Sequence, residues 1–274
     1  MNDRIRGPLL LVGCGKMGSA LLEGWLAEGV APEDVLVVEP ALDPARTSQP
    51  PGVALVATPD EVAADFRPAV VIFAVKPQSM DEVVGHYARF KAPETLYLSI
   101  AAGTRIDYFE TALGTDAAIV RVMPNTPAAV GRGMSVLTAN ANVAEAQRDL
   151  AGRLLASAGA TAWLDDEGLM DAVTAVSGSG PAYVFLLIEC LAEAGVAVGL
   201  PAALAAQLAL ETVAGSGELA RRAEEAPSQL RVNVTSPGGT TAAALEVLMA
   251  EDGLAPVLRR AVEAATRRGR ELGG

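Results

Sequence analysis

The amino-acid sequence predicts an α/β domain with a doubly wound, mostly parallel sheet over residues 1–166, followed by an all-α domain over residues 167–274. Two observations support this division. Short apolar, β-branched runs alternate with helical patterns up to about residue 166, and the β pattern then stops. Strand, helix and strand in succession imply right-handed crossovers, with helices on both faces of one sheet.

The expected strands are apolar throughout rather than alternating, which is typical of parallel strands covered on both faces. They are PLLLVG (8–13), VLVV (35–38), VALVA (53–57), AVVIFAV (69–75), TLYLSIA (95–101), AIVRVMP (118–124), MSVLTA (134–139) and TAWLD (161–165). Between several of these runs, as at 17–27 and 143–158, apolar residues recur at helical spacing.

The second part is expected to be helical and to complete its burial in a partner subunit. Its helical patterns cover 168–176, 181–198, 201–225, 239–250 and 254–272, separated by Gly and Pro. The helices at 181–198 and 201–225 carry more apolar residues than one face can hide in a small domain. We therefore expect a homodimer built mainly from residues 167–274.

Composition excludes several classes of function. The chain carries 33 acidic and 21 basic residues, a net charge of −12, so no basic face is expected for nucleic acid or an anionic membrane. Two cysteines, Cys14 and Cys190, cannot form a disulfide framework or a zinc site and fit a reducing compartment. Glu189 and Glu193 interrupt the longest apolar stretch. We expect a soluble cytoplasmic protein with neither a membrane span nor a bound metal.

A glycine motif directly follows the first expected strand and opens a helical segment. It consists of Gly13, Cys14, Gly15, Lys16, Met17 and Gly18, in the spacing GxGxxG. In the Rossmann dinucleotide-binding fold these glycines allow a tight turn, close approach of the pyrophosphate, and close packing of helix on strand. The helix N-terminus would also favour the anionic pyrophosphate. The alternative is an ordinary glycine-rich turn.

Glu39 ends the second expected strand, about 20 residues beyond Gly18. A carboxylate there would accept hydrogen bonds from a ribose 2′-hydroxyl and repel a 2′-phosphate, which favours NADH over NADPH. Arg46 could instead serve a 2′-phosphate, and Glu39 could be a solvated acid at the end of a strand.

Two further polar features have plainer interpretations. The segment Tyr87 to Lys91 matches the YxxxK pattern of short-chain dehydrogenases but is interpreted as the solvated end of a helix, with His86 facing solvent. The clusters at 177–183 and 233–241 are interpreted as loops that open helices. Both would present N–H groups and hydroxyls to a carboxylate, or they would act only as helix caps.

These residues resemble the pyrroline-5-carboxylate reductase family over nearly the whole chain. The matching stretches are GCGKMG (13–18), AVKPQ (74–78), SIAAG (99–103), RVMPNTPA (121–128), DAVTAVSGSGPAYVF (171–185), AGVAVGLP (194–201) and NVTSPGGTTAAAL (233–245). The resemblance implies reduction of 1-pyrroline-5-carboxylate to L-proline by NADPH or NADH, the final step of proline biosynthesis. It also implies a Rossmann domain, a helical domain that interleaves with a partner to form a dimer, and in some members a larger ring of dimers.

The resemblance also implies site residues. It places pyrophosphate contacts on 13–18 and nicotinamide-side contacts on Val75, Lys76, Pro77, Ile100, Ala101 and Ala102. It places substrate contacts on Glu167, Asn233, Gly239, Thr240 and Thr241, with the Thr241 hydroxyl near the ring nitrogen. Pro59, where many members carry asparagine, and Glu39 depart from the family pattern and leave the choice between NADH and NADPH open.

The scarcity of histidine and lysine agrees with reduction of an imine. Carbonyl reduction needs a proton donor, usually His, Lys or Tyr, whereas a cyclic imine can arrive already protonated. His86 and the lysines at 16, 76 and 91 all lie in the first third of the chain. A 3-hydroxyacid dehydrogenase, which would need a lysine in the second half, is the first alternative. A redox-inactive dinucleotide sensor is the second.

Overall fold

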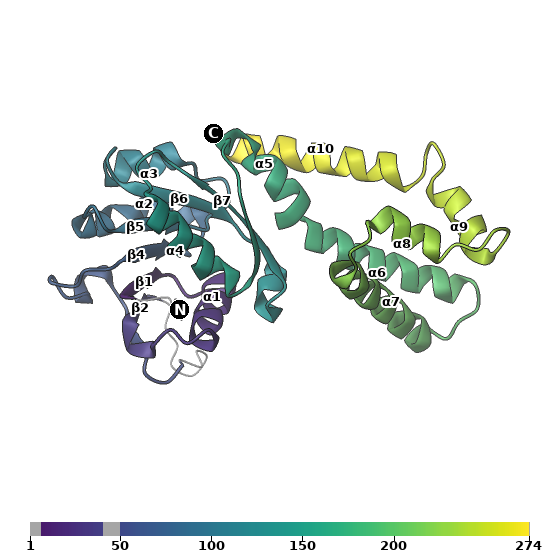
Figure 1. Cartoon of the computed structure of the whole chain (residues 1–274), viewed down its shortest axis with the longest axis horizontal. Helices are drawn as coiled ribbons and strands as arrows, with labels where there is room; N and C mark the ends of the chain where they lie inside the picture. Colours follow the sequence, from purple (N-terminus) through teal and green to yellow (C-terminus); the bar gives the residue numbers. More distant parts are fainter. Residues whose placement is uncertain (1–6, 41–49, 274) are drawn as a thin grey trace. The chain divides into compact units, whose positions relative to one another are not determined.

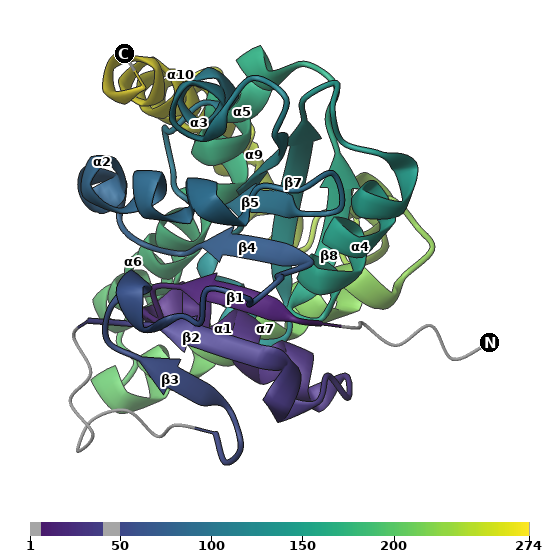
Figure 2. The same cartoon turned by 90° about the vertical axis from the view of Figure 1, so that its left-hand side faces the viewer.

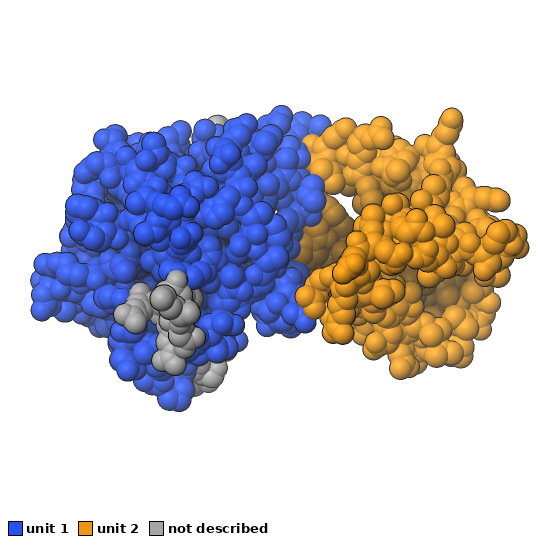
Figure 3. All heavy atoms as spheres, in the orientation of Figure 1, with its two compact units in different colours: residues 1–178, 266–274 blue, residues 179–265 orange. Residues whose placement is uncertain are grey.

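The computed structural model describes residues 7–40 and 50–273, arranged as two compact units. Residues 1–178 and 266–274 form unit 1, and residues 179–265 form unit 2 (Figures 1 and 3). The compact units therefore divide after residue 178, whereas the sequence predicts a domain boundary at 166/167. Residues beyond 166 pack within unit 1, where Met170 and Ala175 are buried and Gly269 lies against Asp171.

The described part of unit 1 contains one eight-stranded sheet, in the order β3-β2-β1-β4-β5-β6-β7-β8. Neighbouring strands run parallel except for β6 and β7, which are antiparallel. The strands are β1 (Leu9–Val12), β2 (Val35–Val38), β3 (Ala54–Val56), β4 (Val70–Phe73), β5 (Leu96–Ser99), β6 (Ala118–Met123), β7 (Gly133–Ala139) and β8 (Gly159–Trp163). All eight coincide with or overlap an expected apolar run, so the predicted doubly wound sheet is confirmed.

The strand order places a switch point beside β1. Leu9 pairs with Val35 of β2 on one side and with Val70 of β4 on the other, so the chain crosses from one half of the sheet to the other here. Figure 2 shows the strands from β3 at the bottom, through β1 and β4, to β5. In open α/β sheets, ligands bind beyond the carboxyl ends of the strands at such a point. The fold thus predicts a site at the ends of β1 and β4.

Helices cover both faces of the sheet. One apolar cluster includes Leu21 and Trp25 of α1 (Lys16–Ala27) and Leu154 of α4 (Glu145–Ala156). The indole Nε1 of Trp25 donates to the Leu154 carbonyl at 2.9 Å. The other cluster includes Met80 of α2 (Met80–Val83), the 3₁₀ segment Val84–Phe90, and α3 (Ile106–Leu113). The sheet is therefore a buried central layer, as its apolar strands indicated.

A continuous helix runs from Glu167 to Ala197. It contains α5 (Met170–Val173), a π-helical turn at Thr174–Gly178, and α6 (Gly180–Ala197). The expectation of a loop near 177–180 that opens a new helix is therefore wrong. Close packing explains the glycine at this turn, because a Cβ on Gly178 would collide with Cε of Met123.

Unit 2 consists of packed helices. They are α6, α7 (Ala202–Arg222), α8 (Pro227–Asn233), α9 (Thr240–Leu248) and the start of α10 (Leu254–Leu272). The helix expected over 201–225 thus ends earlier, and α8 is a separate helix that the sequence reasoning missed. Pro227 explains the break, because proline cannot continue a helix but suits a first turn.

Much of the apolar surface of unit 2 is exposed. Its buried apolar side chains among the described residues are Ala205 and Ala209. Large exposed apolar side chains include Val184, Phe185, Leu186, Leu187 and Leu191 of α6, Leu204, Leu208 and Leu210 of α7, and Val247 and Leu248 of α9. One helix of the described chain, Glu167–Ala197, is long and apolar enough to cross a membrane.

Candidate active site

A cavity of about 550 Å³ lies at the carboxyl ends of β1, β2, β3 and β4. Its position matches the switch point of the sheet. Its lining consists of Val12, Gly13, Gly15, Val38, Glu39, Pro40, Ala57, Thr58, Pro59, Ala74, Val75, Lys76, Ser79, Glu82, Val83, His86 and Tyr87. The structure therefore brings together residues from the glycine motif, the end of β2 and the segment after β4.

The three glycines of the motif fulfil three different steric requirements. Gly13 has φ +87°, and a Cβ on it would lie 2.8 Å from Cγ1 of Val75. A Cβ on Gly18 would lie 2.7 Å from the carbonyl oxygen of Gly13. A Cβ on Gly15 would have no described heavy atom within 4 Å, and this residue faces the cavity. The turn fits a dinucleotide pyrophosphate, because its open glycine lies at the start of α1, where N–H groups favour an anion.

The remaining residues of the motif have different surroundings. Met17 packs against the apolar cluster beneath α1, and Lys16 is exposed. The Sγ of Cys14 lies 3.5 Å from the Ser19 hydroxyl. Burial raises the pKa of the Cys14 thiol, the Ser19 hydrogen bond lowers it, and the carboxylate of Glu39 raises it further. The thiol is therefore protonated at neutral pH.

Glu39 reaches the glycine turn from the end of β2. Its Oε2 accepts a hydrogen bond from the backbone N–H of Cys14 at 2.7 Å. Pro59, on the same cavity wall, accepts a 2.6 Å hydrogen bond at its carbonyl from Arg89. Arg46, the alternative partner for a 2′-phosphate, lies outside the described residues.

Four of the six expected nicotinamide-side residues line one of two cavities. Val75 and Lys76 line the cavity at the switch point. Pro77 and Ala102 line a separate cavity of about 240 Å³. Ala101 is buried in the segment that follows β5, and its N–H donates to Oγ of Ser99 at 3.2 Å.

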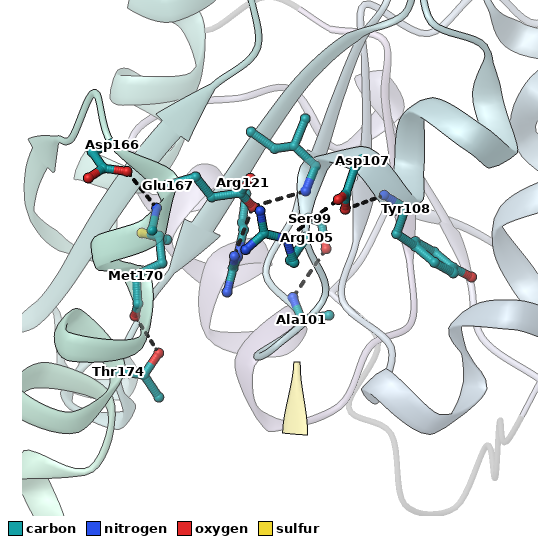
Figure 4. A network of polar contacts seen from close by, with 12 residues as sticks. Ser99, Ala101, Arg105, Asp107, Tyr108, Arg121, Asp166, Glu167, Met170 and Thr174 are labelled. Carbon is teal, nitrogen blue, oxygen red and sulfur yellow. Dashed lines mark hydrogen bonds and ion pairs between the residues drawn. The ribbon is translucent and has the colours of Figure 1, made fainter. Parts of the chain in front are cut away.

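Glu167 forms a partly buried ion pair in unit 1. Its Oε1 lies 2.8 Å from Nη1 of Arg121 on β6, and the two side chains are 18% and 5% exposed (Figure 4). The same oxygen accepts a hydrogen bond from the backbone N–H of Ile106 at 2.9 Å. Sequence reasoning missed Arg121, although it is the one charged residue in the run AIVRVMP. A charge inside a buried strand indicates a buried partner.

The other expected substrate residues belong to unit 2. Asn233 ends α8, and its Nδ2 donates to Glu225 at 3.2 Å, a contact that the sequence did not suggest. Gly239 is the N-cap residue of α9, and Thr240 and Thr241 are its first two residues. Thr241 therefore does not occupy the cap position, which removes the alternative that its hydroxyl serves as the N-cap.

Ser177, the first residue of the cluster at 177–183, is held by an asparagine of the same unit. Nδ2 of Asn125 donates to both the carbonyl and the hydroxyl oxygen of Ser177 at 3.2 Å. Oδ1 of Asn125 accepts a 2.8 Å hydrogen bond from the N–H of Met134. Asn125 thus holds the π turn at Ser177 against the segment after β6.

The YxxxK match does not form a catalytic pair. Lys91 pairs with Asp116 at 2.7 Å, whereas Tyr87 is fully buried against Phe73 and Phe90. The interpretation of Tyr87 as part of a solvated helix end is wrong, because this residue belongs to the aromatic core beneath the sheet. Burial holds the pKa of Tyr87 well above its usual range. His86 is exposed, as expected, and lines the cavity.

Two family models match different parts of the chain. Residues 167–272 match the family model for pyrroline-5-carboxylate reductase dimerisation, and residues 9–103 match that for F420-dependent NADP oxidoreductases. The chain is 41% identical to the pyrroline-5-carboxylate reductase of Pseudomonas aeruginosa, over 96% of each protein. It is 43% identical to that of Synechocystis, over 96% of this chain and 97% of the relative.

Solved structures of reductases also resemble this chain over nearly its whole length. A pyrroline-5-carboxylate reductase from Coxiella burnetii superposes with a TM-score of 0.90 at 34% identity, covering 97% of this chain and 98% of that one. The Plasmodium falciparum pyrroline carboxylate reductase with NADP bound superposes with a TM-score of 0.81 at 33% identity, with the same coverage. Because the likeness extends through both units at this level of identity, the chain belongs to the pyrroline-5-carboxylate reductase family.

Proposed function

We propose that the protein reduces the C=N bond of 1-pyrroline-5-carboxylate to give L-proline, with NADPH or NADH as the reductant. The observation that carries this proposal is the match to reductases over 96% of the chain, because it includes both the glycine turn and the helical unit. The bound dinucleotide would supply a hydride to the imine carbon. The residues of this chain would bind and orient the two reactants.

The cofactor would lie at the switch point of the sheet. The turn from Gly13 to Gly18 would hold the pyrophosphate, with Glu39 on the adenosine side. The nicotinamide side would contact Val75, Lys76 and Pro77 after β4 and 100–102 after β5. The three glycines support this proposal, because a side chain at any of them would collide with the protein or enter the cavity.

The substrate would bind at the start of α9. The first N–H groups of a helix and its dipole favour a carboxylate, so the amides of Gly239 and Thr240 would receive that of the substrate. Asn233 would contribute a side-chain contact. The Thr241 hydroxyl would accept a hydrogen bond from the protonated ring nitrogen, which needs orientation rather than a strong acid.

One steady-state experiment tests this function. NADPH and NADH oxidation would be followed at saturating 1-pyrroline-5-carboxylate, with L-proline quantified as the product. Stoichiometric proline formation is the expected result. Cofactor binding without turnover would instead support the dinucleotide sensor, and oxidation of a 3-hydroxyacid would support the dehydrogenase.

We also propose that the exposed apolar face of unit 2 packs against a second copy of the chain. The dimerisation model covers 167–272, which includes the apolar side chains of α6 and α7. The same burial would account for the apolar helix Glu167–Ala197 without a lipid bilayer, in a cytoplasmic enzyme that binds no nucleic acid. Light scattering in detergent-free buffer should give at least the mass of a homodimer, or of a ring of dimers. An active monomer, or a need for detergent, would contradict this assembly.

A further inference from the structure

The carboxylate of Glu167 joins three segments of unit 1 that are distant in sequence. Its Oε1 lies 2.8 Å from Arg121, 46 residues earlier on β6, and accepts from the N–H of Ile106, 61 residues earlier. Glu167 itself begins the helix that runs to Ala197. Arg121 is only 4% exposed, and Glu167 is the partner that offsets the cost of burying its charge.

The contact with Ile106 caps α3 from a distant part of the chain. Ile106 is the first residue of α3, and the N-cap residue Arg105 provides no side-chain cap. The first N–H groups of a helix need an acceptor, and a carboxylate at this end also interacts favourably with the helix dipole. Glu167 meets both requirements (Figure 4).

The segment 100–105 is therefore held at both ends. It connects β5 to α3, and it includes Ile100 to Ala102, which we place on the nicotinamide side. At its start, the N–H of Ala101 donates to Oγ of Ser99 at 3.2 Å. At its end, Ile106 donates to Glu167. Loss of the second contact would release the end of the segment that leads into α3.

Within unit 1, the cavity beside Glu167 is distinct from the expected cofactor cavity. Glu167 lines a small cavity of about 150 Å³. The other lining residues are Gly103, Arg105, Arg121, Asp171, Arg270 and Gly273. The cavity at the switch point of the same unit has a different lining.

We propose that Glu167 is a positioning residue for the cofactor. Its carboxylate fixes the start of α3 against β6 and so holds 100–105 in the conformation that receives the nicotinamide side. This inference rests on the proposed function only in placing 100–102 beside the cofactor.

The test compares Glu167→Ala and Glu167→Gln with the wild type in the full-length protein. The Kd of NADPH would be measured by its fluorescence without substrate, and the KM for the imine substrate at saturating NADPH. Glu167→Ala should raise the NADPH Kd about tenfold, because the segment 100–105 would lose a contact worth about one hydrogen bond to a charged group. Glu167→Gln should raise it less, because the amide oxygen can still accept from Ile106. The KM for the imine should stay within about twofold for both variants.

The matched control is Asp116→Asn, which removes the carboxylate of an exposed ion pair with Lys91 and should leave both constants unchanged. Melting temperatures would be recorded for every variant, because a purely structural role would lower them without changing the Kd well below melting. If Glu167→Ala does not fold, the NADPH Kd of Glu167→Gln alone tests the proposal. An unchanged NADPH Kd, or a raised imine KM with normal NADPH binding, would overturn the proposal. Wild-type turnover, measured separately, tests the proposed function itself.

Discussion

The backbone N–H of Cys14 donates to Oε2 of Glu39 across 2.7 Å, which links the end of β2 to the glycine turn after β1. This hydrogen bond fixes a carboxylate on the wall of the cavity at the switch point. A negative charge in that position should accept a hydrogen bond from the 2′-hydroxyl of an adenosine ribose and should repel a 2′-phosphate.

Substitution of Glu39 should therefore change the choice of cofactor. A carboxylate beside a 2′-phosphate costs Coulomb energy, so we expect the wild type to prefer NADH and Glu39→Ser to raise the relative efficiency with NADPH. The measurement is kcat/KM for both cofactors at saturating imine. Glu28→Ser, which removes an exposed carboxylate at the end of α1, is the control. A wild type that already prefers NADPH tenfold would contradict this role of Glu39.

Two glycine substitutions in the same turn should separate folding from cofactor binding. A Cβ on Gly18 would lie 2.7 Å from a backbone oxygen, so Gly18→Ala should destabilise the protein by about 1–3 kcal/mol as α1 shifts. A Cβ on Gly15 meets no described atom within 4 Å, so Gly15→Ala should melt within a few degrees of the wild type. Gly15→Ala should nevertheless raise the Kd of NADPH, because the methyl group enters the space for the pyrophosphate. Thermal melts and fluorescence titrations check both, and normal NADPH binding by Gly15→Ala would count against the proposed site.

The Thr241 hydroxyl should affect turnover more than stability. Thr241 is the second residue of α9 and Gly239 is the N-cap, so Thr241→Ala should change the melting temperature little. Loss of one hydrogen bond to a charged ring nitrogen should lower kcat/KM about 10- to 100-fold. Thr241→Ser, which keeps the hydroxyl, should recover most of the activity. An alanine variant with normal kcat/KM would show that the hydroxyl does not contact the reacting imine.

The Cys14 thiol should react slowly with alkylating reagents at neutral pH. Burial raises its pKa, and the thiolate is the nucleophilic form. In a Cys190→Ser background, the rate of iodoacetamide labelling should rise with pH to a midpoint above that of a free cysteine. NADPH should slow the labelling further if the cofactor covers the turn. Mass spectrometry after timed quenching gives the rates, and a midpoint at or below the free-cysteine value would contradict the effect of burial.

The sequence was sufficient to predict the sheet and the glycine turn between β1 and α1. Apolar runs such as LLLV and VVIF predict strands that are buried on both faces, and local composition is enough for this prediction. The GxGxxG spacing predicts a short turn in which side chains would collide. The polar cluster at 177–183 was harder to interpret. Its small residues suggested a loop, whereas the structure continues the helix through a π turn that Asn125 and Met123 pack against.

The sequence by itself thus determined the α/β class, the order of the strands along the chain and the family. Only the tertiary structure decided which side chains meet. Arg121 and Glu167 are 46 residues apart, and Tyr87 enters the aromatic core although its neighbours His86 and Arg89 are exposed. The spacing of apolar residues shows which face of a segment is buried. It does not show which distant segment packs against that face. The partners of Glu167 and Tyr87 are set by the packing of the helices against the sheet.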